Sequence, residues 1–128
     1  MKLSFVKPVY AHCDLPCGVY DPAQAKVEAE SAVGIMKKYA ELEHEEDQWR
    51  AVFIKEQRLE LVKHHLWVLW ADYFKPEHLE KYPELHDKFW KATKQAGLCK
   101  RTTDPAEGQK LLDMIEDISK IFWETKKA

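Results

Sequence analysis

The longest helical pattern in the sequence runs from Gln48 to Phe74. Apolar and aromatic side chains recur there at three- and four-residue steps, at Trp49, Val52, Phe53, Leu59, Val62, Leu66, Leu69, Trp70 and Tyr73. At 1.5 Å per residue such a helix would be roughly 40 Å long. Pro76 should end it, because proline has no backbone N–H for the helical ladder. A helix this long needs other helices to cover its apolar side.

Two nearly identical motifs predict the starts of two more helices. Asp21-Pro22-Ala23-Gln24 and Asp104-Pro105-Ala106-Glu107 each place aspartate at the N-cap and proline at the first helical position. The Gln or Glu three residues after the cap can reach back to the cap's own N–H. We therefore expect one helix over residues 22–43 and another from residue 105 to Thr125.

The remaining segments complete an all-α chain with 4 glycines in 128 residues. A short segment over residues 77–82 should lead to a helix over 83–95 that ends at Gly97 as its C-cap. The expected apolar stripes are Val27, Ile35 and Leu42 on the first helix, and Leu111, Ile115, Ile118 and Phe122 on the last. Four amphipathic helices with short links predict an up-and-down four-helix bundle in one domain.

Charge and hydropathy exclude two kinds of partner. The net charge is −2 and no basic stripe stands out, so we expect no nucleic-acid partner. No apolar run approaches the ~20 residues of a membrane-spanning helix, so we expect no membrane partner. The three cysteines are too few for a disulfide scaffold and are typical of ligands or redox groups in a reducing compartment, which favours a cytoplasmic location.

The first eleven residues, MKLSFVKPVYA, are interpreted as a leader. Ser4, Lys7 and Pro8 break their apolar stretch, so they lack the roughly 7–15-residue hydrophobic region of an export signal. Export remains a minor alternative. The expected division is a leader over residues 1–11, removed on maturation, and a folded domain over residues 12–128.

Cys13 and Cys17 are the chemically most informative residues. On spacing alone they are either two unrelated thiols in an N-terminal arm or metal ligands; a closed zinc site is less favoured, because it needs four ligands. Cys99 follows Gly97, and we expect it in a turn as a partly exposed thiol without a role.

His12, directly before Cys13, favours a particular metal site. If the chain were cut after Ala11, the new His12 amine and the Cys13 amide nitrogen would form a chelate ring, and the two thiolates would complete a planar N₂S₂ set. The His12 imidazole could add an axial nitrogen, and such a set suits Ni(II). Pro16 favours a tight hook that returns Cys17 to the metal, and Gly18 permits unusual backbone angles beyond it.

The sequence also resembles one enzyme family over nearly all of residues 12–128. HCDLPCGVYDP (12–22) is similar to the N-terminal nickel hook of the nickel superoxide dismutases. Further similar stretches are IKEQR (54–58), KHH (63–65), LWADYFKP (69–76), KYPELH (81–86) and IFWETKKA (121–128). Anionic amide and thiolate donors would stabilise the higher oxidation state that superoxide chemistry requires. The resemblance implies a superoxide dismutase with one nickel per subunit, a four-helix fold, a homohexamer and a leader removed by a dedicated peptidase.

The resemblance also implies a set of site residues. The ligands would be His12, Cys13 and Cys17, in a hook spanning residues 12–20. Tyr20 and Tyr73 would flank the open face of the metal, and Glu28 and Arg58 would hold the His12 ring. Asp14 would support the loop. Without the resemblance, Tyr73 would be interpreted as a core aromatic, and Glu28 and Arg58 as solvated helix charges.

Two rival functions can be stated from the sequence. A ferritin-like di-iron bundle needs Glu-x-x-His on two helices, and only Glu41-Leu42-Glu43-His44 matches. A nickel-binding or thiol-redox module without enzymatic activity would share the hook's ligands, but it would have no need of the tyrosine pair and the Glu28–Arg58 pair together.

Overall fold

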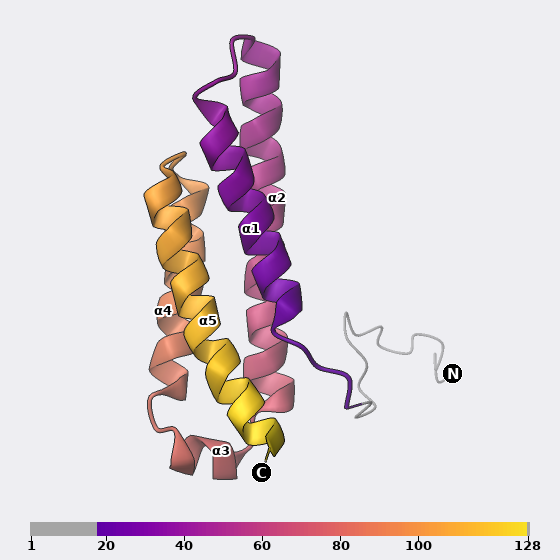
Figure 1. Cartoon of the computed structure of the whole chain (residues 1–128), viewed down its shortest axis with the longest axis vertical. Coiled ribbons are helices and arrows are strands. Elements are labelled where there is room, and N and C mark those ends of the chain that lie inside the picture. The colour runs from indigo at the N-terminus through magenta and orange to yellow at the C-terminus, as the bar shows by residue number, and fades with distance from the viewer. Residues whose placement is uncertain (1–17, 128) are drawn as a thin grey trace, which may run out of the picture.

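The computed structural model describes residues 18–127, and within this range the chain is helical with no strand. The elements are α1 (Ala23–Tyr39), α2 (Glu45–Val68), the π-helix η1 (Leu69–Tyr73), α3 (Pro76–Lys81), α4 (Leu85–Lys100) and α5 (Pro105–Lys127). Four of these, α1, α2, α4 and α5, are long enough to form a bundle, whereas α3 is a single short segment at its base (Figure 1).

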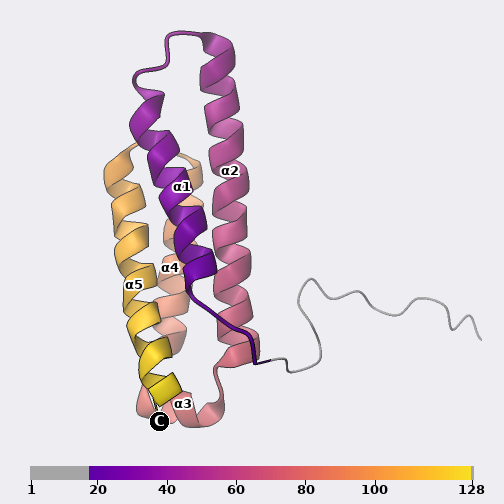
Figure 2. The ribbon, with the colours of Figure 1, turned by 45° about the vertical axis from the view of Figure 1, so that its right-hand side comes forward.

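The four long helices alternate in direction, so that neighbours along the chain are antiparallel (Figure 1). Each packs against two others: α1 contacts α2 and α5, and α4 contacts α2 and α5. This arrangement confirms the predicted all-α up-and-down four-helix bundle. The end of α2, the start of α3 and the C-terminal end of α5 lie together at the base, where the chain also enters α1 (Figure 2).

The predicted start of α5 at Pro105 is confirmed, and α1 begins at Ala23, one residue after the predicted start. The side-chain oxygen Oδ1 of Asp21 accepts a hydrogen bond of 2.8 Å from the Ala23 N–H, and Asp104 does the same for Ala106 at 2.9 Å. Each carboxylate satisfies one of the N–H groups that have no partner within the helix. Glu107 does not reach back to its cap, because its carboxylate pairs with Lys110 and Gln95 instead.

The end of α4 differs from the prediction, because Gly97 lies inside the helix and not at its C-cap. The helix continues to Lys100, where its last carbonyls are satisfied by a side chain from α2. The ammonium of Lys55, only 2% exposed, donates to the carbonyl oxygens of Cys99 at 2.9 Å, Lys100 at 3.0 Å and Thr102. Burial lowers the pKa of Lys55. A cation at a helix C-terminus also opposes the negative end of the helix dipole.

The core face of α1 also differs from the predicted stripe. Val27 is 60% exposed, Ile35 and Leu42 are only partly buried, and the buried residues are instead Ala25, Ala29, Ala32, Val33 and Met36. Small side chains let α1 approach its neighbours closely. On α5, Gly108 faces α1 at a point where an added Cβ would lie 2.6 Å from a methyl carbon of Val33. The first helix also ends at Tyr39, before the predicted boundary.

The predicted stripe of α5 is confirmed, and that of the long helix is confirmed in part, because the predicted Val52 and Trp70 are 40% and 44% exposed. Leu59, Val62, Leu66 and Leu69 are buried, as are Leu111, Ile115, Ile118 and Phe122. In contrast, Trp49 and Phe53 are 70% and 65% exposed. The hairpin of α1 and α2 extends beyond the ends of α4 and α5, so neither α4 nor α5 covers this part of α2 (Figure 2).

Cys99 is a buried residue of α4, and the expectation of a partly exposed thiol in a turn is wrong. The helix continues past Gly97, so the Cys99 side chain faces the core with 0% exposure. Desolvation raises its pKa from 9.0 to about 11. The folded protein therefore favours the neutral thiol over the thiolate.

This pKa shift predicts a pH-dependent loss of stability. The unfolded chain releases the Cys99 proton near pH 9 and the folded chain near pH 11, so this group stabilises the fold fully below pH 9 and loses its contribution as the pH rises to about 11. Denaturant unfolding from pH 7 to 11 should show a steeper decline for the unmodified chain than for Cys99→Ala. Parallel declines for the two proteins would contradict the shift.

Candidate metal centre

The three predicted metal ligands, His12, Cys13 and Cys17, lie outside the described residues, as does Asp14. The described chain begins at Gly18, directly after Cys17. Gly18 has a φ of +71°, a conformation that favours glycine and agrees with the expected change of direction at this point. Gly18 and Tyr20, at the end of the predicted hook, both line a cavity.

A cavity of about 340 Å³ lies at the base of the bundle next to Gly18. It is formed where the chain enters α1, where α2 ends and where α5 ends. Its lining consists of Gly18, Tyr20, Asp72, Tyr73, Lys75, His78 and Lys126. The residue that follows Cys17 is therefore part of the cavity wall, together with both tyrosines of the predicted set.

Tyr20 and Tyr73 are neighbours although 52 residues separate them in the sequence. Their ring centroids lie 5.6 Å apart with an interplanar angle of 56°. Tyr73 also contacts the core, since its ring centroid is 4.4 Å from that of Phe122. It is thus a core-contacting aromatic and a cavity-lining phenol at once, and the two interpretations of this residue do not exclude each other.

The position of Tyr73 depends on η1, which interrupts the long helix predicted to reach Phe74. The Phe74 N–H donates to the Leu69 carbonyl over 3.1 Å, a bond that spans one residue more than an α-helical bond. The wider turn changes the direction of the side chains that follow it. Phe74 is buried against Phe89 and Phe122, whereas Tyr73 faces the cavity. Lys75 is extended and Pro76 begins α3, so Pro76 does end the long helix, as predicted.

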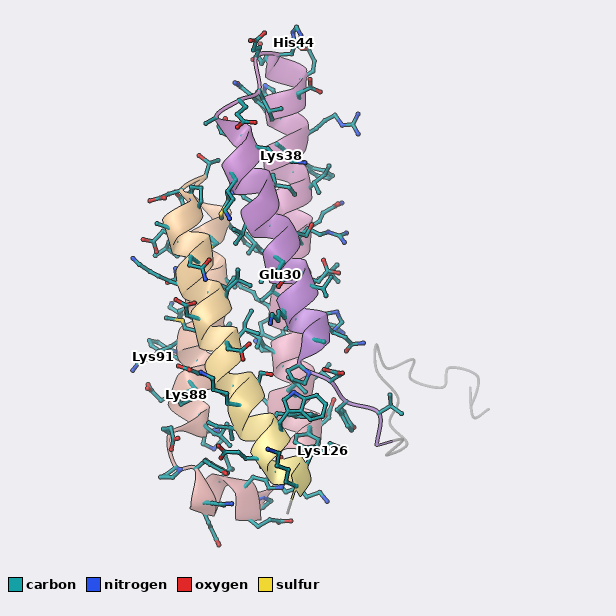
Figure 3. The ribbon with its side chains drawn as sticks, in the orientation of Figure 1. Glu30, Lys38, His44, Lys88, Lys91 and Lys126 are labelled. Atoms are coloured by element: carbon teal, nitrogen blue, oxygen red, sulfur yellow. The ribbon has the colours of Figure 1, made fainter. Side chains whose placement is uncertain are left out.

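Polar and aromatic groups surround the Tyr73 ring on several sides. The His78 ring stacks on it at 5.8 Å with an interplanar angle of 17°, and the Lys126 ammonium lies 5.0 Å from its centroid. Figure 3 shows Lys126 on the last turn of α5. The Tyr73 hydroxyl lies 2.7 Å from the Thr125 hydroxyl. These contacts fix the ring and place a positive charge at the cavity.

Glu28 and Arg58 form an ion pair between α1 and α2, with a guanidinium nitrogen 3.1 Å from a carboxylate oxygen. Their side chains are only 19% and 34% exposed, so they are not solvated helix charges. The Arg58 Nε is buried and has no hydrogen-bond partner among residues 18–127. A buried donor without a partner is costly, so this atom suits an acceptor supplied by another part of the chain.

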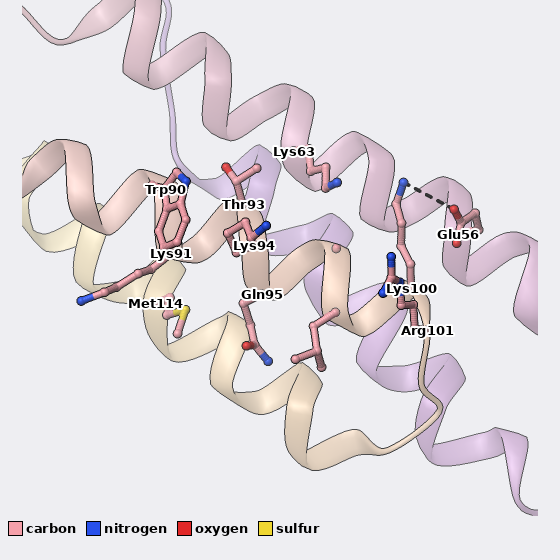
Figure 4. A pocket seen from close by; sticks show the side chains of 12 residues that line it. Glu56, Lys63, Trp90, Lys91, Thr93, Lys94, Gln95, Lys100, Arg101 and Met114 are labelled. Atoms are coloured by element: carbon pink, nitrogen blue, oxygen red, sulfur yellow. Dashed lines mark ion pairs between the residues drawn. The ribbon is translucent and has the colours of Figure 1, made fainter.

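A larger cavity, of about 850 Å³, lies between α2 and α4 (Figure 4). Its lining includes Lys63, Trp90, Lys94 and Arg101 but no cysteine or histidine. Lys100, also in this wall, is held by Glu56 and Glu60 of α2. This cavity has the greater volume, but it lacks the thiol and imidazole donors of a transition-metal site.

The di-iron alternative fails for the described residues. Across residues 18–127 no group of three or more His, Cys, Asp or Glu side chains is placed to hold a metal ion. His44, the histidine of the single Glu-x-x-His match, precedes α2 at the exposed end of the α1–α2 hairpin. A metal bound by the bundle interior, as in ferritin-like proteins, therefore has no ligand set in this part of the chain.

The described residues form an all-α four-helix bundle with a cavity at its base. Gly18, in the cavity wall, is directly preceded in the sequence by the segment that contains Cys13 and Cys17. A sequence model of the family described as nickel-containing superoxide dismutase matches residues 7–126. The chain belongs to this family, whose members use nickel to dismutate superoxide.

Individual relatives agree with this assignment. The chain is 62% identical over 120 residues to a superoxide dismutase [Ni] of Streptomyces seoulensis, covering 94% of this chain and 92% of the relative. It is 60% identical, with the same coverage, to the enzyme of Streptomyces coelicolor. A native nickel superoxide dismutase structure superposes with a TM-score of 0.89 at 60% identity, covering 91% of this chain and all of that chain.

Sequence reasoning missed three residues around the tyrosine pair: His78, Thr125 and Lys126. Lys126 lies in the similar stretch IFWETKKA but was not among the predicted site residues. A signal for Thr125 and Lys126 was present, because both lie one helical turn after the predicted core residue Phe122. No local pattern indicates His78, since its contact with Tyr73 depends on the η1 turn.

Lys126 gives a prediction about the charge of the cavity. Lys126→Gln should lower kcat/KM for superoxide by roughly threefold at low ionic strength and by less at high salt, because a positive charge at a cavity attracts an anion. Pulse radiolysis of nickel-loaded protein measures this. Lys127→Gln is the matched control, since Lys127 is exposed and does not line the cavity. Equal effects of the two substitutions would contradict a local role for Lys126.

Proposed function

We propose that the chain is cleaved after Ala11 and then dismutates superoxide at one nickel ion held by His12, Cys13 and Cys17. Residues 1–11 are the leader, residues 12–128 the enzyme, and residues 12–20 the hook. The observation that carries the proposal is the position of Gly18: this residue, which directly follows the His-Cys-x-x-x-Cys sequence, lines a cavity together with two tyrosines.

The lengths of solved relatives support the removal of the leader. The native nickel superoxide dismutase structure is matched over its whole length by 91% of this chain. The part of this chain without a counterpart there is about as long as residues 1–11 of 128. A free amine on His12 requires such a cut, because the backbone nitrogen of an internal histidine is an amide.

The chain offers a donor set that suits nickel. The His12 amine and imidazole, the Cys13 amide and thiolate, and the Cys17 thiolate are the nitrogen and sulfur donors that Ni(II) accepts in tetragonal geometry. When bound, nickel would supply the one-electron oxidation and reduction of superoxide. The Arg58 Nε, buried without a partner among the described residues, fits the requirement for a group that orients the hook.

The roles of the other residues follow from their positions. Arg58, held by Glu28 between two helices, would orient the His12 imidazole and fix its tautomer. Tyr20 and Tyr73 would restrict access from the cavity, which has room for a small anion and a few waters. Lys126 would raise the local concentration of superoxide at the cavity.

The proposal includes partners and a location. Large exposed side chains, among them Trp49, Phe53 and Trp90, suit subunit contacts in a homo-oligomer, which we propose is a hexamer. A maturation peptidase would act at Ala11, in the cytoplasm, and neither nucleic acid nor a membrane would be a partner. None of the helices formed by residues 18–127 is both long enough and apolar enough to cross a membrane.

The ligand assignment predicts the effect of removing single thiols. Cys13→Ser and Cys17→Ser should each abolish nickel binding and superoxide dismutation, because a neutral hydroxyl does not replace a thiolate ligand. Elemental analysis and pulse radiolysis measure the two properties. Cys99→Ala is the control and should retain both. Full nickel content and activity in either serine variant would contradict the assignment, and nickel binding without dismutation in the unmodified chain would favour a nickel carrier.

A further inference from the structure

Two short hydrogen bonds meet at the hydroxyl of Thr125. The oxygen Oγ1 lies 2.6 Å from the carbonyl oxygen of Phe122, one turn earlier in α5. It also lies 2.7 Å from the phenol oxygen of Tyr73. Thr125 therefore connects the cavity-lining tyrosine to the backbone of the last helix.

The directions of these bonds follow from counting protons. A threonine hydroxyl has one proton to donate, and a carbonyl oxygen can only accept. The bond to Phe122 therefore uses the Thr125 proton. The bond between the two hydroxyls then requires that Tyr73 donates and Thr125 accepts. In the opposite arrangement two acceptor oxygens would face each other at 2.6 Å without a proton between them.

The surroundings of Tyr73 keep its ring in this arrangement. The His78 ring lies against one face, Lys126 lies over the ring, and Phe122 contacts it from the core. These contacts fix the position of the phenol oxygen, and turning its proton away from α5 would break the hydrogen bond to Thr125. Its proton stays directed at α5.

We propose that Thr125 is a positioning residue that makes Tyr73 a hydrogen-bond acceptor, not a donor, toward the cavity. An anion needs a donor, so Tyr73 does not bind superoxide or a competing anion through its hydroxyl. It can accept a hydrogen bond from water or from hydrogen peroxide, the protonated product. This inference rests on the proposed function insofar as the cavity is the route to the nickel hook.

The first test observes the hydroxyl in the full metal-free chain and so does not depend on nickel or activity. Ultraviolet resonance Raman spectra report whether a phenol donates or accepts, through the tyrosine Fermi doublet. Subtracting the spectrum of Tyr73→Phe from that of the unmodified chain isolates Tyr73. The Fermi doublet in this difference spectrum should have the intensity ratio of a phenol that donates a hydrogen bond. The ratio should change in Thr125→Val and stay the same in Thr125→Ser, which retains the hydroxyl.

The second test uses azide as a probe anion on nickel-loaded protein. Thr125→Val leaves the Tyr73 proton free to turn to the cavity, so azide inhibition should tighten by about tenfold, the effect of one hydrogen bond to a charged group. The tightening should be absent in Thr125→Ser and in the double variant Thr125→Val, Tyr73→Phe. Tyr73→Phe alone should change the azide inhibition constant by less than about twofold, because no donor to the anion is lost.

Several results would overturn the inference. An acceptor-type doublet for Tyr73 in the unmodified chain would do so, as would an unchanged doublet in Thr125→Val. Azide inhibition that weakens about tenfold in Tyr73→Phe alone would show that Tyr73 already donates to the anion, and this arm does not need a folded Thr125 variant. Absence of nickel or dismutase activity in the mature unmodified protein would refute the proposed function instead, while the Raman result would still decide the direction of the hydroxyl.

Discussion

The hydrogen bond from the Phe74 N–H to the Leu69 carbonyl determines how the base of the bundle is built. It closes one wide turn at the end of the long α2 helix, and the last two residues of this turn have different surroundings. Phe74 joins the core beside Phe89 and Phe122, while Tyr73 meets Tyr20 at the cavity. Wide turns of this kind often occur at functional sites. Here the turn places a phenol where the N-terminal segment arrives.

The proposed metal site would draw its residues from two parts of the chain, the N-terminal segment and the bundle. The N-terminal segment carries the thiol, amide and imidazole groups that suit nickel. The bundle supplies cavity-lining side chains, among them the tyrosine pair and Lys126. Outside this lining it supplies the Thr125 hydroxyl, which bonds to Tyr73, and the Glu28–Arg58 ion pair. In the proposed function, the hook would supply the metal ligands and the bundle would supply the side chains around them.

What the sequence predicted well was local. The two Asp-Pro helix starts depend on bonds within three residues, and the stripes of α2 and α5 depend only on helical periodicity. The α1 stripe was predicted wrongly, because it was assigned to large apolar residues, whereas close helix packing required alanines. The end of α4 was also wrong, because the group that satisfies its carbonyls is Lys55, 44 residues before Cys99.

The site residues show the same distinction between near and distant contacts. Tyr20 and Tyr73, and Glu28 and Arg58, come together only through the fold, and the resemblance to a family, not any local pattern, indicated both pairs. The structure confirms that each pair is in contact. Thr125 lies one helical turn after Phe122, but its hydrogen bond with Tyr73 depends on the fold, and no spacing in the sequence predicts that bond.

The central claim is that the metal site needs a free amine at His12, and comparing two forms of one chain tests it most directly. One form begins at His12 and the other retains Met1–Ala11; both are exposed to the same nickel, and intact mass, nickel content and superoxide dismutation are measured. The account predicts about one nickel per chain, with activity, in the form that begins at His12, and neither in the longer form. An active, nickel-loaded protein whose mass still includes Met1–Ala11 would contradict it.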